Sequence, residues 1–307
     1  MNKPKVLVLL GPTASGKTAL GVRLALRYKG EIVSADSRQV YKGMDIGSGK
    51  DLGEYKVGKK VVPYHLIDVV SPNTEFNLAK YQKLALKAMA DIIKRGKLPI
   101  IVGGTGLYLQ ALVDNYRLSS VKPDLGKRRE LEALSREELF QRLEKLKPDF
   151  AHKLNNSDKN NPRRLVRYLE ILEQGSSLEM KKESPYDFLI LGLTYPDEVL
   201  RERIIKRINN RLEHEDMLGE VKRLHVEGVS WRRLLSFGLE YKFLSQYLLE
   251  KLDYESMLQK LSDASYRFAK RQKTWFKRWE KQGRVIESVS SFQEAEKKIE
   301  SWLKLGL

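Results

Sequence analysis

The 307-residue chain contains no cysteine, which excludes disulfide bonds and thiolate metal sites. Its four histidines are scattered without the spacing of zinc ligands, so we interpret them as surface or structural residues. No run approaches the roughly 20 apolar residues that span a bilayer, and residues 1–5 lead into an apolar run without the pattern of a signal peptide. We therefore expect a cytoplasmic protein that makes no membrane contact.

Negative charge is also scarce. The chain has 40 Asp and Glu against 57 Lys and Arg, a formal net charge of +17. An excess of this size indicates a polyanionic partner, nucleic acid first and an anionic membrane surface second. A solubilising, lysine-rich surface is the alternative interpretation. The hydrophobic content of 41% is typical of a globular protein, and the length allows two lobes.

Residues 11–18 read Gly-Pro-Thr-Ala-Ser-Gly-Lys-Thr, between an apolar run and a helical pattern. A strand, a loop of the form G-x-x-x-x-G-K-[ST] and a helix together make a phosphate-binding P-loop. Gly11 and Gly16 let successive backbone N–H groups point inward at a helix N-terminus, which favours an anion. Lys17 adds a positive charge, and the Thr18 hydroxyl suits a phosphate-bound Mg²⁺. The motif predicts binding of a di- or triphosphate, but it leaves open which one and whether a phosphoryl group is transferred.

Short apolar strands alternate with helical patterns in the first third of the chain. We expect strands at 5–10, 31–34 and 98–102, a further one within 65–70, and helices at 17–28, 77–94 and 107–113. This alternation predicts an α/β fold, with a P-loop NTPase-like parallel sheet flanked by helices. Residues 43–60, rich in glycine and lysine, read as a mobile loop.

The pattern changes near residue 114. From 114 to 185 it is helical, charged and interrupted by prolines, which predicts a helical insertion domain. A strand at 188–193 then rejoins the sheet, and residues 196–283 are almost entirely helical. We therefore expect a catalytic core at 1–113 and 186–307 with a helical C-terminal region.

Two polar residues follow strands at the edge where ligands of parallel sheets bind. Asp36 comes just after the second strand, where a carboxylate serves a bound diphosphate as metal partner or general base, or else caps a turn. Thr105 lies in the turn Gly103-Gly104-Thr105-Gly106, where it lines the same edge or caps the helix that follows.

Three basic helical patterns are further candidates for binding phosphate. Arg203 and Arg207 share one helix face, as do Arg163 and Arg167, and a solvated basic face is the alternative in both cases. In the pattern 266–279, Phe268, Trp275 and Trp279 form an aromatic stripe that favours packing. A second stripe on that helix suits an RNA backbone and consists of Lys270, Lys273, Lys277 and Arg284.

Taken together, these segments resemble the bacterial tRNA dimethylallyltransferases, also called tRNA isopentenyltransferases. The resemblance rests on five motifs that occur in the family's order over nearly the whole chain. They are the P-loop, Ser-Ala-Asp-Ser-Arg-Gln-Val-Tyr-Lys-Gly-Met-Asp-Ile-Gly at 34–47, Tyr-His-Leu-Ile-Asp at 64–68, Gly-Gly-Thr-Gly-Leu-Tyr-Leu at 103–109, and Ala-Lys-Arg-Gln-Lys-Thr-Trp-Phe at 269–276.

The resemblance implies transfer of a dimethylallyl group from dimethylallyl diphosphate to N6 of the adenosine immediately 3′ of the anticodon, with Mg²⁺ as cofactor and the tRNA anticodon stem-loop as partner. Asp36 matches the general base, and the catalytic set would also include Lys17, Arg207 and Thr105. The diphosphate would be bound by Gly11, Thr13, Ala14, Ser15, Gly16, Lys17 and Thr18, with Thr18 on the metal. The tRNA would be contacted by Asp36, Ser37, Arg38, Gln39, Thr105, Arg163, Arg164, Arg167, Lys270, Lys273 and Lys277. Base flipping is expected, because the target base must leave its stack to reach such a site. We expect a monomer.

Some segments depart from the family pattern. Residues 154–158 replace its usual Ile-His-Pro-Asn-Asp, and residues 237–242 differ by spacing from its more frequent Ile-Gly-Tyr-Lys-Glu, so no role is carried onto the latter. Two alternatives stay open. One is an adenylate isopentenyltransferase that acts on free AMP or ADP, and the other is a P-loop ATP-dependent RNA-binding protein or kinase.

Overall fold

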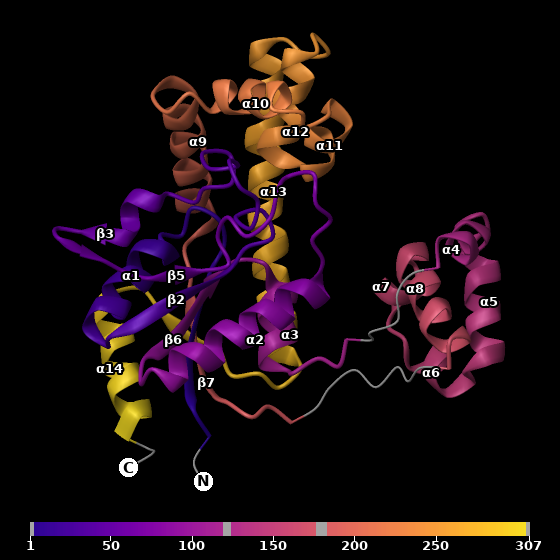
Figure 1. The fold of residues 1–307 in the computed structure, drawn as a ribbon, viewed down its shortest axis with the longest axis horizontal. Coiled ribbons are helices and arrows are strands. Elements are labelled where there is room, and N and C mark those ends of the chain that lie inside the picture. The colour runs from indigo at the N-terminus through magenta and orange to yellow at the C-terminus, as the bar shows by residue number, and fades with distance from the viewer. Residues whose placement is uncertain (1–2, 119–123, 176–182, 305–307) are drawn as a thin grey trace. The chain divides into compact units, whose positions relative to one another are not determined.

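A computed structural model of the chain describes residues 3–118, 124–175 and 183–304. Its centre is a parallel sheet of six strands in the order β5-β2-β6-β1-β7-β8 (Figure 1). These strands are β1 (Lys5–Leu10), β2 (Gly30–Ala35), β5 (Tyr64–His65), β6 (Leu98–Gly103), β7 (Asp187–Leu193) and β8 (Glu287–Val289). The central strands are buried on both faces, as their continuous apolar runs require. The expected α/β fold with a parallel sheet flanked by helices is confirmed.

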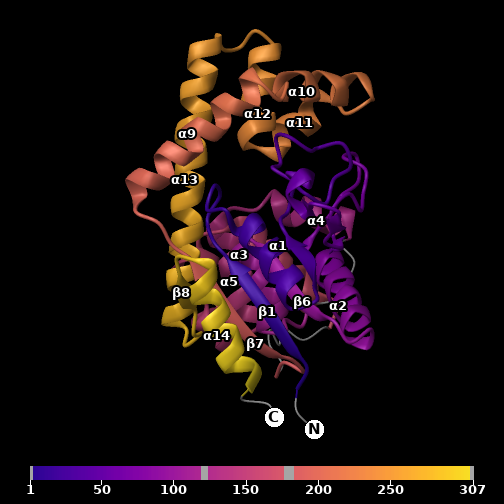
Figure 2. The same ribbon diagram turned by 90° about the vertical axis from the view of Figure 1, so that its left-hand side faces the viewer.

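Alternate residues of β1 point to two hydrophobic layers. Leu7 and Leu9 pack against α1 (Lys17–Arg27) and α14 (Phe292–Lys304). Val6 and Val8 pack on the other face against α2 (Leu78–Lys94) and α3 (Gly106–Val113), as Figures 1 and 2 show. The two layers hold the carboxyl ends of β1, β2 and β6 at one edge of the sheet.

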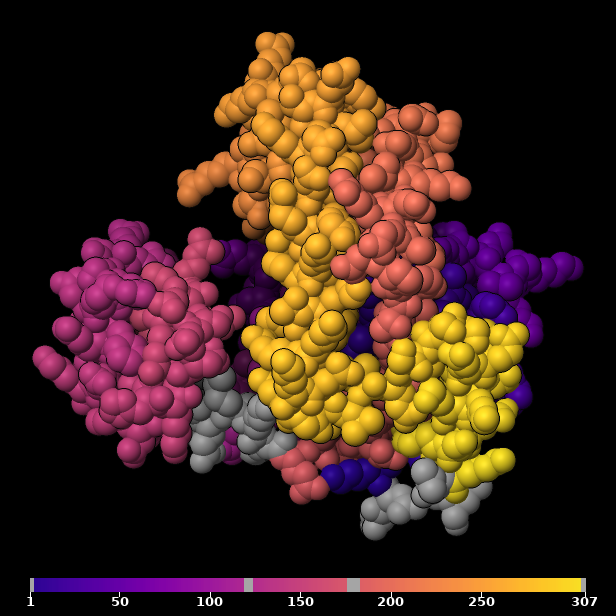
Figure 3. Space-filling model, turned by 180° about the vertical axis from the view of Figure 1, so that it is seen from behind, coloured from indigo at the N-terminus to yellow at the C-terminus, as the bar shows by residue number. Residues whose placement is uncertain are grey.

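A helical lobe lies beyond that edge. It comprises α9 (Asp197–Glu213), α10 (Met217–Val226), α11 (Trp231–Phe237), α12 (Leu239–Leu248) and α13 (Tyr254–Lys281). These helices share a core with Val40, Tyr41 and Met44, which follow β2. The long helix α13 runs from this lobe down beside the sheet, and Figure 3 shows it along the surface seen from behind. It thereby joins the lobe to the sheet.

Residues 115–183 form a separate compact unit. Its helices are α4 (Leu125–Glu132), α5 (Arg136–Leu146), α6 (Pro148–Lys153), α7 (Asn156–Lys159) and α8 (Pro162–Glu173). They enclose a small apolar core that includes Leu139, Leu143 and Leu169. The remaining 3–114 and 184–304 make the other unit.

The sequence expectations fail at three places. Residues 43–60 are not simply a mobile loop: they contain a 3₁₀ helix (Leu52–Tyr55), a hairpin of β3 (Lys56–Val57) and β4 (Lys60–Val61), and a fully buried Lys50. The strand expected within 65–70 is only Tyr64–His65, because Leu66 and Asp68 have positive φ and turn the chain. Strand β8 and helix α14 were not anticipated at all.

None of the helices in the described parts of the chain combines the length and apolar character needed to cross a membrane.

Candidate active site

The P-loop joins β1 to α1 at the edge of the sheet. Gly16 has φ 76° and occupies the N-cap position of α1, so the loop turns in the left-handed region just before the helix begins. Ala14 also has positive φ, at 59°, a strained conformation for a residue with a Cβ. The loop lines a cavity of about 560 Å³ with Thr13, Ala14, Gly16, Lys17 and Thr18, whereas Gly11 and Ser15 do not line it.

Thr13 is held from two directions. Its hydroxyl accepts a hydrogen bond from the guanidinium of Arg207 on α9. Its N–H donates to Gln272 Oε1 at 2.8 Å, and Gln272 Nε2 donates to the carbonyl of Gly104 at 2.8 Å. Gln272 is buried, and a side chain at Gly104 would collide with it. The amide of Gln272 therefore ties α13 to the P-loop and to the glycine turn after β6.

Two cations meet at the P-loop. Burial lowers the pKa of Lys17 to about 8, and Asp36 offsets part of this effect. Burial also lowers the pKa of Arg207 to about 10, and the charge of Arg211 acts in the same direction. Burial and like-charge repulsion both disfavour these cations, so an anion between them would relieve the repulsion. The electrostatics therefore favour a polyphosphate ligand.

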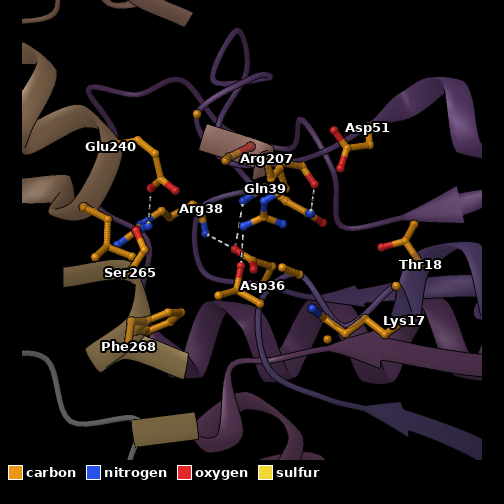
Figure 4. A pocket seen from close by; sticks show the side chains of 18 of the residues that line it. Lys17, Thr18, Asp36, Arg38, Gln39, Asp51, Arg207, Glu240, Ser265 and Phe268 are labelled. Carbon is orange, nitrogen blue, oxygen red and sulfur yellow. Dashed lines mark hydrogen bonds and ion pairs between the residues drawn. The ribbon is translucent and has the colours of Figure 1, made fainter. Parts of the chain in front are cut away.

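Asp36 follows β2 directly and lies between the P-loop and the far wall of the cavity (Figure 4). Its Oδ1 accepts the N–H groups of Arg38, at 2.8 Å, and Gln39, at 3.4 Å. The turn-capping role left open by the sequence is thus real, and it occupies Oδ1. Because both of these bonds go to Oδ1, the described residues leave Oδ2 of the same carboxyl available for chemistry in the cavity.

Thr105 supports the same turn. It occupies the N-cap position of α3, but its hydroxyl does not cap that helix. Instead, Thr105 Oγ1 accepts the N–H of Ser37 at 3.2 Å. The sequence-level alternative of a hydroxyl cap is therefore wrong, and the side chain is placed at the rim of the cavity beside Asp36.

Another wall of the cavity, which includes residues 47–49 and 51, depends on residues that the sequence reading missed. Glu220 accepts the N–H groups of Asp45, Ile46 and Gly47 at 2.8, 2.6 and 3.0 Å, and it also accepts the Tyr241 hydroxyl. Lys50 is fully buried and pairs with Asp45 and Asp68. No local spacing signals these contacts, because their partners lie 5 to 175 residues away.

Other predicted RNA-contacting residues are distributed over the two units. On α13, Lys270 and Lys277 are exposed, but Lys273 Nζ is bound to Asp197 and to the carbonyl of Tyr195. In the 115–183 unit Arg163 is exposed, Arg164 pairs with Asp158, and Arg167 pairs with the buried Glu170 at 3.1 Å. Ser37, Arg38 and Gln39 line the cavity.

Two of the four histidines have structural surroundings. His65 Nε2 lies 2.8 Å from Glu31, and His225 stacks on Trp231. Within the described ranges, no three His, Cys, Asp or Glu side chains cluster as metal ligands. The fold and the site thus define a P-loop enzyme whose anion site faces a carboxylate, Asp36, across one cavity.

Comparison with known proteins narrows this class. The model of the IPP transferase family matches residues 39–279, and that of isopentenyl transferase matches residues 4–62. tRNA dimethylallyltransferase 1 of Geotalea uraniireducens is 45% identical to this chain, over 98% of this chain and 97% of the relative. tRNA dimethylallyltransferase 2 of Porphyromonas gingivalis is 42% identical, over 98% of both chains. The crystal structure of tRNA isopentenylpyrophosphate transferase from Bacillus halodurans superposes with a TM-score of 0.69 at 34% identity, over 98% of this chain and 96% of that one.

A structure of a eukaryotic dimethylallyltransferase acting on tRNA gives a TM-score of 0.72 at 28% identity, over 89% of this chain and 69% of that one. The chain belongs to the IPP transferase family and is a tRNA dimethylallyltransferase.

Proposed function

We propose that the cavity transfers a dimethylallyl group from dimethylallyl diphosphate to N6 of the adenosine immediately 3′ of the anticodon in tRNA, with release of diphosphate. The observation that carries this proposal is the placement of Asp36 in the same cavity as the P-loop cations Lys17 and Arg207. One end of the cavity suits a diphosphate, and its middle offers a base to an incoming amine. The family relationship supplies the identity of both substrates.

In this reaction N6 attacks the allylic carbon, the bond from that carbon to the diphosphate oxygen breaks, and the diphosphate leaves with the electron pair. The N6 proton passes to Asp36, whose Oδ2 is not engaged by the turn. Lys17, Arg207 and the P-loop N–H groups stabilise the charge that grows on the leaving group. Thr13 and Thr105 orient Arg207 and the Asp36 turn.

The residues present also suit Mg²⁺, a hard cation that prefers oxygen ligands and retains water. Thr18 lines the cavity, and the carboxylate of Asp51 lies on the same side in Figure 4. Thr18 would hold the ion directly. When bound, Mg²⁺ would neutralise charge on the diphosphate.

We further propose that tRNA contacts Ser37, Arg38 and Gln39 in the cavity, Lys270 and Lys277 on α13, and the 115–183 unit through Arg163. Arg164, Arg167 and Lys273 have intramolecular partners, so for them a secondary contribution is proposed. We infer a monomer, since one chain supplies every residue that lines the cavity, and action in the cytoplasm, where tRNA is found.

The test is transfer of labelled dimethylallyl to unmodified tRNA, compared with AMP, followed by mass analysis of the anticodon loop. Label in the loop is the expected result. Label on AMP alone would favour an adenylate isopentenyltransferase. Sustained ATP turnover without use of dimethylallyl diphosphate would favour an ATP-dependent RNA-binding protein or kinase.

A further inference from the structure

Glu240 is a buried carboxylate in the cavity wall that the reaction described above does not use. It lies in the first turn of α12, after Gly238 and Leu239, whose φ angles of 73° and 42° turn the chain at the start of that helix. Its side chain is 8% exposed, yet it lines the cavity. Because burying a carboxylate without hydrogen bonds is costly, the bonds of each of its oxygens matter.

Only one of these oxygens has a bond within the described chain. Glu240 Oε2 accepts from the Arg38 guanidinium at 3.2 Å. Arg38 is fixed in turn, because its backbone N–H binds Asp36 and its guanidinium lies 5.8 Å from the centre of the Phe268 ring. In Figure 4 a dashed line joins only one oxygen of Glu240 to Arg38. The cavity therefore contains a carboxylate oxygen with spare capacity to accept a hydrogen bond.

The position of Glu240 shows which substrate could use this oxygen. Figure 4 places Lys17 and Thr18 at one end of the cavity, Glu240 and Phe268 at the other, and Asp36 between them. In a displacement the nucleophile approaches from the side opposite the leaving group. With the diphosphate on the P-loop, a placement that rests on the proposed function, the target nucleoside lies on the Glu240 side.

Adenosine offers few hydrogen-bond donors: the N6 amino group at the base edge and the hydroxyls of the ribose. A carboxylate accepts from either source, whereas it repels the oxo group that guanosine carries at the same position. We propose that Glu240 accepts a hydrogen bond from the target nucleoside and so helps to select adenosine. The residue is thereby a specificity determinant that acts alongside Asp36.

The test combines the substitution Glu240→Gln with changes of the target nucleoside in a double-mutant cycle. The measured quantity is the dissociation constant of each protein for each anticodon stem-loop. Glutamine keeps one oxygen for Arg38 and presents an amide N–H₂, a donor, to the cavity. The target position carries adenosine, purine riboside without the amino group, or 2′-deoxyadenosine. Glu255→Gln makes the same change at an exposed residue of α13 and serves as the matched control. Unfolding temperatures show whether each variant folds.

We expect wild type to bind one analogue about tenfold more weakly than adenosine, and Glu240→Gln to lose at least fivefold of that preference. Coupling on the purine riboside arm identifies the amino group and supports the selection of adenosine. Coupling on the deoxy arm alone identifies the ribose, which guanosine shares, and overturns the role of Glu240 in selecting adenosine. If Glu240 only held Arg38, the fold-changes in Kd caused by the substitution and by the analogue would be independent and would multiply. Fold-changes that multiply to within a factor of two on both arms therefore overturn the proposal. If the variant does not fold, the affinities of the wild-type protein for the three stem-loops test the proposal. Equal affinity for all three overturns it. Prenyl transfer by wild type is assayed separately, so a failure of the proposed function is recognised independently.

Discussion

At the scale of single residues, Asp36 combines two tasks in one carboxyl group. Oδ1 closes the turn that carries Arg38 and Gln39, and in the proposed reaction Oδ2 receives the N6 proton. A base of this kind must be rigid, since a displacement of about 1 Å costs much of the rate advantage of a positioned group. The two hydrogen bonds that Oδ1 accepts in the turn hold the carboxyl group rigid.

Substitution separates the two tasks. Asp36→Asn keeps an oxygen for the Arg38 N–H but cannot accept the proton, so we expect kcat to fall by about 10² to 10⁴. Asp36→Ala also loses the turn and should nearly abolish transfer, while tRNA affinity stays within about threefold of wild type in both variants. Single-turnover transfer and stem-loop binding measure these effects. Near-normal turnover in Asp36→Asn would rule out the role as base.

At the scale of elements, the site depends on contacts between segments that are remote in sequence. Gln272 is the clearest example, because α13 approaches the P-loop and the Gly104 turn through this one amide. Gly104 has to lack a side chain for that approach. The P-loop, the Gly104 turn and helix α13 therefore share one anchor.

Removal of this anchor should lower both the stability of the protein and the affinity of the P-loop for diphosphate. Gln272→Leu leaves the Thr13 N–H and the Gly104 carbonyl without their partner, which we expect to cost about 1 to 3 kcal/mol of stability. Diphosphate affinity should fall in parallel, because the P-loop is less well ordered. Calorimetry and thermal unfolding measure the two quantities. Gln259→Leu, at an exposed position of the same helix, is the control and should change neither.

The lysines of the basic stripe on α13 differ in their contacts. Lys270 and Lys277 are exposed, whereas Lys273 is bound to Asp197 and Tyr195. The double substitution Lys270→Ala with Lys277→Ala should weaken tRNA binding and flatten the slope of log affinity against log salt by about 1 to 2, as expected for two lost phosphate contacts. Lys273→Ala should leave the slope nearly unchanged. An unaltered slope in the double variant would exclude this stripe from the RNA interface.

At the scale of the whole molecule, the sheet is tied at its edge by the acidic residue Glu31. Its carboxylate binds Arg95, at the end of α2, and His65 on β5. The hydrogen bond with Arg95 lowers the pKa of Glu31 from its ordinary 4.5 to about 2, against the effect of burial. Because the folded pKa lies below the unfolded one, the ionised group stabilises the fold above pH 4.5, and that contribution disappears as the pH falls toward 2.

This linkage predicts how stability depends on pH. We expect Glu31→Gln to lower the free energy of unfolding at pH 7 by about 2 to 3 kcal/mol, and the difference from wild type to close between pH 4.5 and pH 2. Urea titrations across this range measure it. A difference that stays constant with pH would show that the loss comes from packing and not from the charge.

The features that local chemistry encodes could be predicted from the order of the amino acids alone. The P-loop, the alternation of strands and helices, and the placement of Asp36 and Thr105 after strands follow from short-range spacing, since parallel strands bring their carboxyl ends to one edge. The family motifs identified the chemistry, which the comparisons confirm.

The folded chain was needed to show which charged residues are available and which are engaged. Lys50, Glu220 and Gln272 look like ordinary polar residues in the sequence, yet each is buried on partners brought close by folding. Conversely, Lys273 belongs to a basic pattern but has an intramolecular partner. Burial and pairing are properties of contacts between remote segments, so no local pattern reports them. For the same reason Glu240, to which the motif assigned no role, became visible only as a carboxylate facing the cavity.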